Sequence, residues 1–126
     1  SDAQVARQVR DIFPQMTARP ARLAPLLDDV AKSEGRAIGD AIYEQYAVDL
    51  RPQLREIRSP VLVVLADGGL QDRMRAHART VPDHRVVVIP GAKHFVMLDE
   101  PARFHAAIDS FLAEHPAAGS APIAAL

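Results

Sequence analysis

The segments SPVLVVLADGG (59–69) and RVVVIPG (85–91) set the fold class of this chain. Each contains a short, unbroken run of aliphatic residues bounded by proline or glycine. Continuous rather than alternating apolar character is typical of strands that are covered on both faces of a parallel sheet. We therefore predict an α/β fold in which residues 61–66 and 85–89 are neighbouring parallel strands.

Helices are predicted between the two strands and after the second one. Turns at Pro82-Asp83 and Pro90-Gly91 bound the second strand, and the last helix is expected to begin near Pro101. Strand, helix, strand, helix is the order of a βαβα unit. Two parallel strands do not make a stable sheet by themselves, so we expect the rest of the sheet to lie on another polypeptide. The apolar positions of the two helices are Leu70, Met74, Ala78 and Val81, and Phe104, Ile108, Phe111 and Leu112.

Residues 1 to about 58 favour helices only. Apolar stripes at helical spacing predict amphipathic helices, with a kink or an end at Pro14 and a new start after Pro20. A break is expected at Ser33-Glu34-Gly35, and a short separate turn is expected past Pro52. The stripes comprise Val5, Val9, Ile12, Phe13 and Met16, then Leu23, Leu26, Leu27 and Val30, then Ile38, Ala41, Ile42 and Tyr46.

The composition is that of a folded polypeptide with room for one core. The chain has 126 residues, of which 48% are hydrophobic and 25% are charged. A net charge of -1 with scattered arginines argues against a nucleic-acid interface. The absence of cysteine excludes disulfides, thiol nucleophiles and cysteine-based zinc sites. The longest apolar run is far shorter than the ~20 residues that span a bilayer, so we expect no membrane association. The compartment is not determined, and a cytoplasmic location in a bacterium is our expectation.

Polar groups follow both predicted strands. Asp67 leaves the first strand directly and precedes two glycines, and His94 lies in the loop that follows Pro90-Gly91. Functional groups of open α/β sheets gather at the carboxyl ends of the strands, where an acid and an imidazole on neighbouring strands can meet. Such a pair fixes the tautomer of the histidine and stabilises its cation while it takes a proton from a nucleophile.

These elements occur in the order of a known family. A buried strand with an acidic loop is followed by a second strand that ends in Pro-Gly, then by GAKHF (91–95) and EPARF (100–104). From about residue 48 to 115 the chain resembles the final third of an α/β-hydrolase, and the helices before it are similar to the cap of such enzymes. The resemblance implies a helical cap segment at 1–50, the C-terminal βαβα part of the hydrolase core at 51–115 and a flexible tail at 116–126.

By this resemblance His94 is the catalytic base, whereas the acid is open. Family members place a glycine at the strand end and an aspartate three residues on, but counting from Ala66 that position holds Gly69. Asp67 is the first choice, because it leaves the strand end directly. Asp72 is the second choice, although an acid at a helix start also has a capping role. The third alternative is an acid from elsewhere or none. No role is assigned to the remaining histidines, and no metal or cofactor is expected.

The nucleophile of the family lies in a Gly-x-Ser-x-Gly elbow. No serine of this chain is in that frame; they are Ser1, Ser33, Ser59, Ser110 and Ser120. We expect the nucleophile and the oxyanion hole on a separate N-terminal chain, and we expect this chain alone to be inert. Ser1 within a cap region suggests proteolytic processing that leaves a heterodimer, and the alternative is a boundary without biological meaning.

The expected function is therefore that of the histidine- and acid-bearing half of a serine-type α/β-hydrolase of the esterase type. Its substrate would be a small molecule with an ester, amide or related carbonyl group. One alternative is a non-enzymatic member of the superfamily that serves binding or assembly with a decayed site, and Gly69 at the usual acid position favours it. Another is a small helical domain joined to a βαβ fragment with its own role.

Overall fold

Two parallel strands form the sheet in the computed structural model, which describes residues 2–30 and 32–116. Strand β1 (Val61–Ala66) pairs with β2 (His84–Ile89) in a register that runs from Val61 opposite His84 to Ala66 opposite Ile89. Helix α4 (Gln71–Ala78) connects them, since parallel neighbours need a crossover rather than a tight turn. Both predicted strands, their parallel pairing and the helix between them are confirmed.

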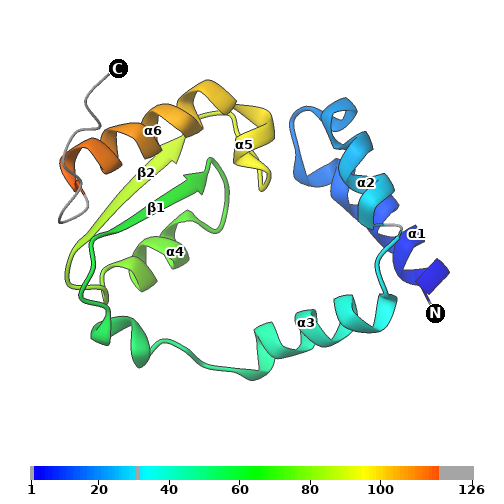
Figure 1. Cartoon of the computed structure of the whole chain (residues 1–126), viewed down its shortest axis with the longest axis horizontal. Helices are drawn as coiled ribbons and strands as arrows, with labels where there is room; N and C mark the ends of the chain where they lie inside the picture. The colour runs from blue at the N-terminus through cyan, green and yellow to red at the C-terminus, as the bar shows by residue number, and fades with distance from the viewer. Residues whose placement is uncertain (1, 31, 117–126) are drawn as a thin grey trace, which may run out of the picture.

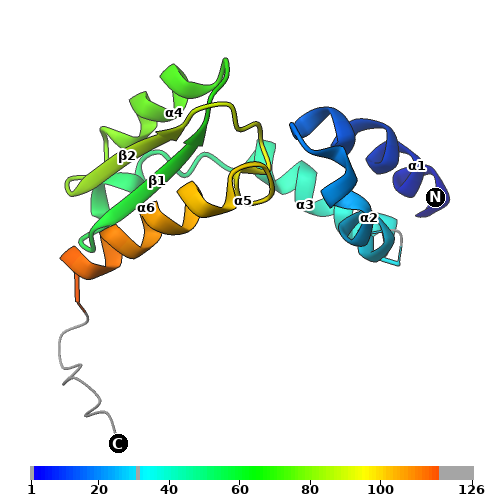
Figure 2. The same ribbon diagram turned by 90° about the horizontal axis from the view of Figure 1, so that it is seen from above.

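The two faces of the sheet are covered by different helices. Figure 2 shows the strands between α4 and α6 (Pro101–Glu114), which lie on opposite sides of them. The core beside the strand ends consists of buried Ile89, Ala92 and Val96, against which Phe104 of α6 packs. The sheet and its two helices therefore form a three-layer unit around a small core.

Helices cover both faces of the strands, as predicted, but most strand residues are only half-buried. Only Leu65 in β1 and Ile89 in β2 are buried, and the other strand residues keep intermediate exposure. The physical reason is the width of the sheet, because the described residues contain two strands only and each strand has one outer edge without a neighbour. A side chain next to such an edge cannot be enclosed by flanking residues on both sides.

The N-terminal residues are helical, as predicted. Helix α1 (Asp2–Ile12) changes at Pro14 into the 3-10 turn η1 (Phe13–Met16), because proline cannot donate the hydrogen bond that would continue the α-helix. Pro20 begins a second 3-10 turn. The elements after η1 are η2 (Pro20–Leu23), α2 (Ala24–Val30), α3 (Gly35–Ala47) and η3 (Gln53–Glu56).

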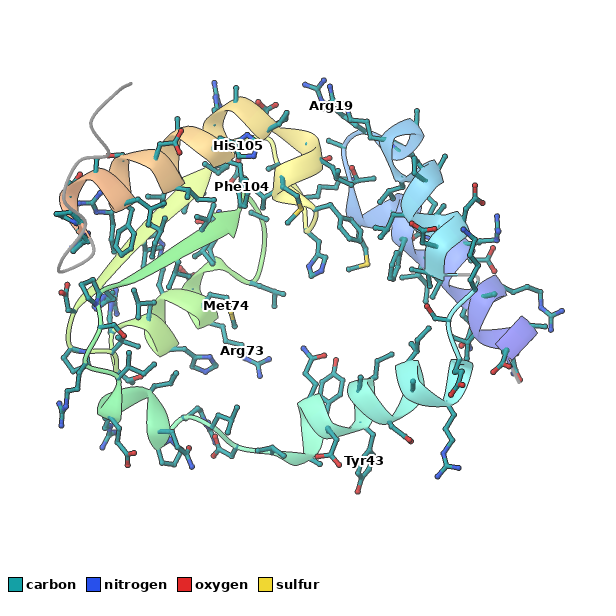
Figure 3. The ribbon with its side chains drawn as sticks, in the orientation of Figure 1. Arg19, Tyr43, Arg73, Met74, Phe104 and His105 are labelled. Carbon is teal, nitrogen blue, oxygen red and sulfur yellow. The ribbon has the colours of Figure 1, made fainter. Side chains whose placement is uncertain are left out.

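Helix α3 carries its apolar stripe on an exposed surface. Ile42 is 53% exposed and Tyr46 is 85% exposed, although the spacing of these residues is that of a buried helix face. In Figure 1 the chain curves into an open ring, in which the sheet lies opposite α1 and α2 and α3 runs between the two parts. Figure 3 shows Tyr43 of α3 pointing away from the rest of the chain.

The structure adds one element that the sequence did not predict, and some predictions lie outside it. A single helical turn, α5 (Val96–Asp99), lies between the histidine loop and α6. Of the predicted flexible tail only Pro116 is described, and Ser1 also lies outside the described residues. None of the helices in the described ranges has the length and apolar character that a membrane crossing requires.

Gly35 and Gly39 provide a matched test of the packing of α3 on α1. A Cβ atom at Gly35 would lie 2.8 Å from Asp2 Oδ1 and 3.0 Å from Asp2 Cα, whereas a Cβ atom at Gly39 would meet nothing within 4 Å. We expect Gly35→Ala to lower the free energy of unfolding by about 1–3 kcal/mol through overpacking. Gly39→Ala should raise it by up to about 1 kcal/mol, since alanine is the better helix former. Urea denaturation followed by circular dichroism at 222 nm measures both, and equal effects of the two changes would contradict the contact.

Candidate functional site

The loops that leave β1 and β2 lie side by side. The backbone N–H of Asp67 donates to the carbonyl of Ala92 at 3.0 Å, which joins the two loops just beyond the ends of the strands. Gly91 turns the second loop with a φ of 76°, in the left-handed region that glycine adopts readily. The parallel register thus brings the predicted acid and the loop of the predicted base to the same edge of the sheet.

Asp67 makes two hydrogen bonds through its carboxylate. Oδ1 accepts from Nε2 of Gln71 at 3.0 Å, and Oδ2 accepts from the backbone N–H of Gly91 at 3.3 Å. The second bond connects the two loops, three residues before the histidine. Asp67 itself is exposed to solvent. The Asp67 carboxylate therefore stabilises the start of the histidine loop at Gly91.

His94 is exposed in the loop between β2 and α5, and its imidazole rests on an aromatic neighbour. The His94 ring meets the Phe95 ring edge to face, with 5.1 Å between centroids. The Phe95 ring in turn packs against Phe13 of η1 at 5.4 Å. In the described part of the chain no hydrogen bond joins His94 to Asp67 or Asp72, so the pairing of base and acid stays a prediction.

Asp72 lies in the first turn of α4. Its side chain is exposed, and no hydrogen bond to it is found among the described residues. A negative charge at this position interacts favourably with the helix dipole, which is the capping role that the sequence left open. Asp72 therefore has an ordinary structural role available, whereas Asp67 contacts the histidine loop directly.

Asp99, at the end of α5, is a site residue that the sequence did not predict. Its side chain is 1% exposed, and it accepts hydrogen bonds from the backbone N–H of Lys93 at 2.8 Å, from the backbone N–H of Ala18 at 2.9 Å and from the hydroxyl of Thr17. Lys93 directly precedes His94. The available signal was an acid directly after the apolar run Phe95-Val96-Met97-Leu98, where a buried acid needs polar partners.

Hydrogen bonding lowers the pKa of Asp99. Desolvation by burial raises this pKa, but the hydrogen bonds that the carboxylate accepts from Thr17, Lys93 and Ala18 outweigh it, and the pKa lies below the ordinary 3.8. Asp99 is therefore ionised at neutral pH, since each of these donors favours the charged form.

Segment 13–23 docks on the histidine loop through further contacts. Phe95 donates its backbone N–H to the carbonyl of Met16 at 3.4 Å, and the guanidinium of Arg22 donates to the carbonyl of Leu98 at 2.7 Å. Arg19 and Glu100 form a partly exposed ion pair at 3.6 Å. The predicted cap helices and the predicted site are thus in direct contact.

Two open surface hollows lie away from His94. One of about 550 Å³ lies between β2 and α6 and includes Arg103 and Ser110. Another, of about 470 Å³, lies between the end of α3 and α4 and includes Tyr46 and Arg73. Figure 3 shows Arg73 and Met74 on the side of α4 that faces α3. Neither hollow is lined by His94 or Asp67, so a substrate cleft at His94 would need further walls.

Two of the remaining histidines have ordinary contacts with the backbone. Nδ1 of His84 donates to the carbonyl of Val81, and Nδ1 of His115 donates to the carbonyl of Phe111, each at 2.8 Å. Within residues 2–30 and 32–116 no group of three or more histidine, aspartate and glutamate side chains is arranged to hold a metal ion.

Comparison with known proteins gives one informative similarity. The rat (Rattus norvegicus) protein named "Putative protein-lysine deacylase ABHD14B" is 37% identical to this chain over 62 residues, which is 46% of this chain and 28% of that protein. The chain therefore spans less than a third of the length of the relative that it matches. This similarity supports a relationship to the α/β-hydrolases. No family model matches the sequence, and no solved structure matches it.

The depressed pKa of Asp99 predicts how stability depends on pH. A carboxylate with a lower pKa in the folded state stabilises the fold fully above its unfolded pKa of 3.8, and the contribution is lost as the pH falls through the folded pKa. We expect Asp99→Asn to lower the free energy of unfolding by about 1–3 kcal/mol at pH 7 and to flatten the fall in stability below pH ~4. Urea unfolding between pH 7 and pH 2 measures this, with exposed Asp109→Asn as the control. Parallel pH curves for wild type and Asp99→Asn would contradict it.

Proposed function

We propose that this chain is the histidine- and acid-bearing C-terminal half of a serine-type α/β-hydrolase. In this proposal residues 1–50 are the cap segment and residues 51–115 are the core segment. The observation that carries it is the pair of strand-end loops, in which the Asp67 carboxylate holds the N–H of Gly91 three residues before His94. The similarity to an α/β-hydrolase over 62 residues supports the same superfamily.

His94 acts as the general base in the proposed reaction. Its imidazole takes the proton of a serine hydroxyl while the serine oxygen attacks the carbonyl carbon of the substrate, and it then gives that proton to the leaving alcohol or amine. A water molecule is deprotonated by the same ring in the second half of the reaction, and it releases the acyl group as a carboxylic acid. The serine is proposed to lie in a Gly-x-Ser-x-Gly elbow on a separate N-terminal chain.

Asp67 orients His94 in this proposal. Its carboxylate has more acceptor positions than the bonds from Gln71 and Gly91 occupy, so it can also accept from Nδ1 of His94. Because Asp67 is exposed here, the site requires cover from the nucleophile-bearing half, which would also exclude water and strengthen the acid–base pair.

The substrate class is a carbonyl compound with an acyl group on oxygen or nitrogen. The relative is named for protein-lysine deacylation, which is the cleavage of an amide, and this reaction falls within the class. An acyl-lysine peptide is therefore a sensible second substrate beside a simple activated ester.

His94→Ala should abolish hydrolysis in the protein assembled with its nucleophile-bearing half. We expect a fall in kcat of at least ~10³-fold on p-nitrophenyl acetate, because loss of the base leaves only binding and oxyanion stabilisation. His105→Ala, at an exposed position of α6, is the matched control and should keep the wild-type rate. An unchanged rate in His94→Ala would refute the assignment of the base.

Asp67→Asn and Asp72→Asn distinguish the two candidate acids in the same assay. Asp67→Asn should lower kcat by up to ~10⁴-fold, as in a triad whose histidine is held in the wrong tautomer. Asp72→Asn should leave kcat within about twofold, since a first-turn charge affects helix stability by only about 0.3–1 kcal/mol. The opposite pattern would assign the acid to Asp72.

The second candidate is a non-enzymatic member that serves binding or assembly. The bonding of the Asp67 carboxylate to Gly91 and Gln71, rather than to His94, favours it. Intact-mass measurement of the native protein, followed by the esterase assay, separates the two proposals. A partner chain with a Gly-x-Ser-x-Gly elbow and a turnover that depends on His94 supports the hydrolase, whereas a complete protein without turnover supports the binding role.

A further inference from the structure

The carboxylate of Asp99 is charged and buried, which is energetically unfavourable unless polar contacts compensate for it. It is the only charged side chain that is fully buried among the described residues. Removing a carboxylate from water is costly unless hydrogen bonds replace its hydration. An apolar residue at the end of α5 would avoid that cost. The presence of a carboxylate there indicates that its hydrogen bonds have a function.

The carboxylate joins two segments that are far apart in sequence. Thr17 and Asp99 are separated by 82 positions, yet the Thr17 hydroxyl donates to Oδ1 of Asp99. The Thr17 oxygen also accepts from the backbone N–H of Arg19 at 2.9 Å, so the direction of the hydroxyl bond is fixed. Oδ2 of Asp99 is left for the N–H of Lys93. Both oxygens therefore act as acceptors only.

These bonds hold the backbone of His94 from both sides. The bond from Lys93 to Asp99 closes a loop over residues 93–99, and the backbone N–H of Asp99 bonds the carbonyl of Phe95 at 3.0 Å within it. After His94, the N–H of Phe95 is bonded to Met16, and the Phe95 ring lies between the His94 ring and Phe13. The His94 imidazole thus rests on a support that segment 13–18 anchors.

From this geometry we propose that Asp99 and Thr17 are positioning residues for His94, acting through Lys93 and Phe95 rather than on the substrate. This inference rests on the proposed role of His94 as the base. A catalytic group must be held within a fraction of an ångström of its productive position, and a displacement of about 1 Å can cost ~10²-fold in rate. The hydrogen bonds of Asp99 and Thr17 also connect the cap segment to the His94 imidazole.

Thr17 offers the sharper pair of variants. Thr17→Val keeps the shape of the side chain and removes the hydroxyl, whereas Thr17→Ser keeps the hydroxyl. Asp99→Asn is the second variant, because its amide has one acceptor oxygen and one donor nitrogen in a place where both atoms must accept. Asp109→Asn, on the exposed face of α6, is the matched control for the change of charge.

In the assembled enzyme we expect Thr17→Val and Asp99→Asn to lower kcat on p-nitrophenyl acetate by about 10–100-fold with KM within about twofold. Thr17→Ser should restore kcat to within about threefold of wild type, and Asp109→Asn should leave it unchanged. Far-UV circular dichroism establishes that each variant is folded. If Asp99→Asn does not fold, the comparison of Thr17→Val with Thr17→Ser still tests the inference. Wild-type kcat in folded Thr17→Val, or no rescue by serine, would overturn the inference.

A second measurement keeps this test separate from that of the proposed function. Amide hydrogen exchange at Lys93 and the ring chemical shifts of His94, both followed by NMR, report the anchoring without any turnover. Exchange at Lys93 should accelerate at least about tenfold in Thr17→Val and not in Thr17→Ser, while exchange at Val87 in β2 stays unchanged. Unaltered Lys93 exchange and His94 shifts would refute the positioning role. Failure of the proposed function would instead be seen as full turnover in His94→Ala.

Discussion

The parallel pairing of β1 with β2 is the constraint on which the rest of the structure depends. Because the register sets Ala66 opposite Ile89, both strands end at the same level and their loops begin side by side. The bonds from Asp67 to Ala92 and from Gly91 to Asp67 follow from that coincidence. A shift of the register by one residue would move the inward-facing side chains to the other face and separate these loops. The position of the candidate site is therefore a property of the sheet.

The Asp99 carboxylate makes the helical segment and the sheet segment interdependent. The residues that donate to it come from the turn after η1 and from the loop before α5, so each segment completes the hydrogen bonding of the other. Phe13 on Phe95 and Arg22 on Leu98 extend the contact on either side of this bond network. The N-terminal helices, which lie opposite the sheet, are thereby held at the loop that carries the candidate base.

Much apolar surface of this chain lies where a neighbour could cover it. The outer edges of both strands have no partner among the described residues, and the apolar stripe of α3 is exposed at Ile42 and Tyr46. Unpaired strand edges invite pairing with another strand, and exposed apolar helix faces favour association. These features support the proposal that a second half completes the sheet and the site, in which the walls of a substrate cleft around His94 would come from that half.

The sequence alone determined most of the secondary structure, apart from α5, and the edge at which polar groups gather. Local patterns suffice for this, since aliphatic runs bounded by proline or glycine predicted β1 and β2, helical periodicity predicted α4 and α6, and Pro14 predicted the end of α1. Asp67 and His94 were predicted at neighbouring strand ends for the same reason. Only the tertiary structure decided which partners the carboxylates have: Asp67 bonds Gly91, and Asp99 binds Thr17 across 82 positions. Hydrogen bonds between distant segments depend on how the helices dock, and no local pattern encodes that docking.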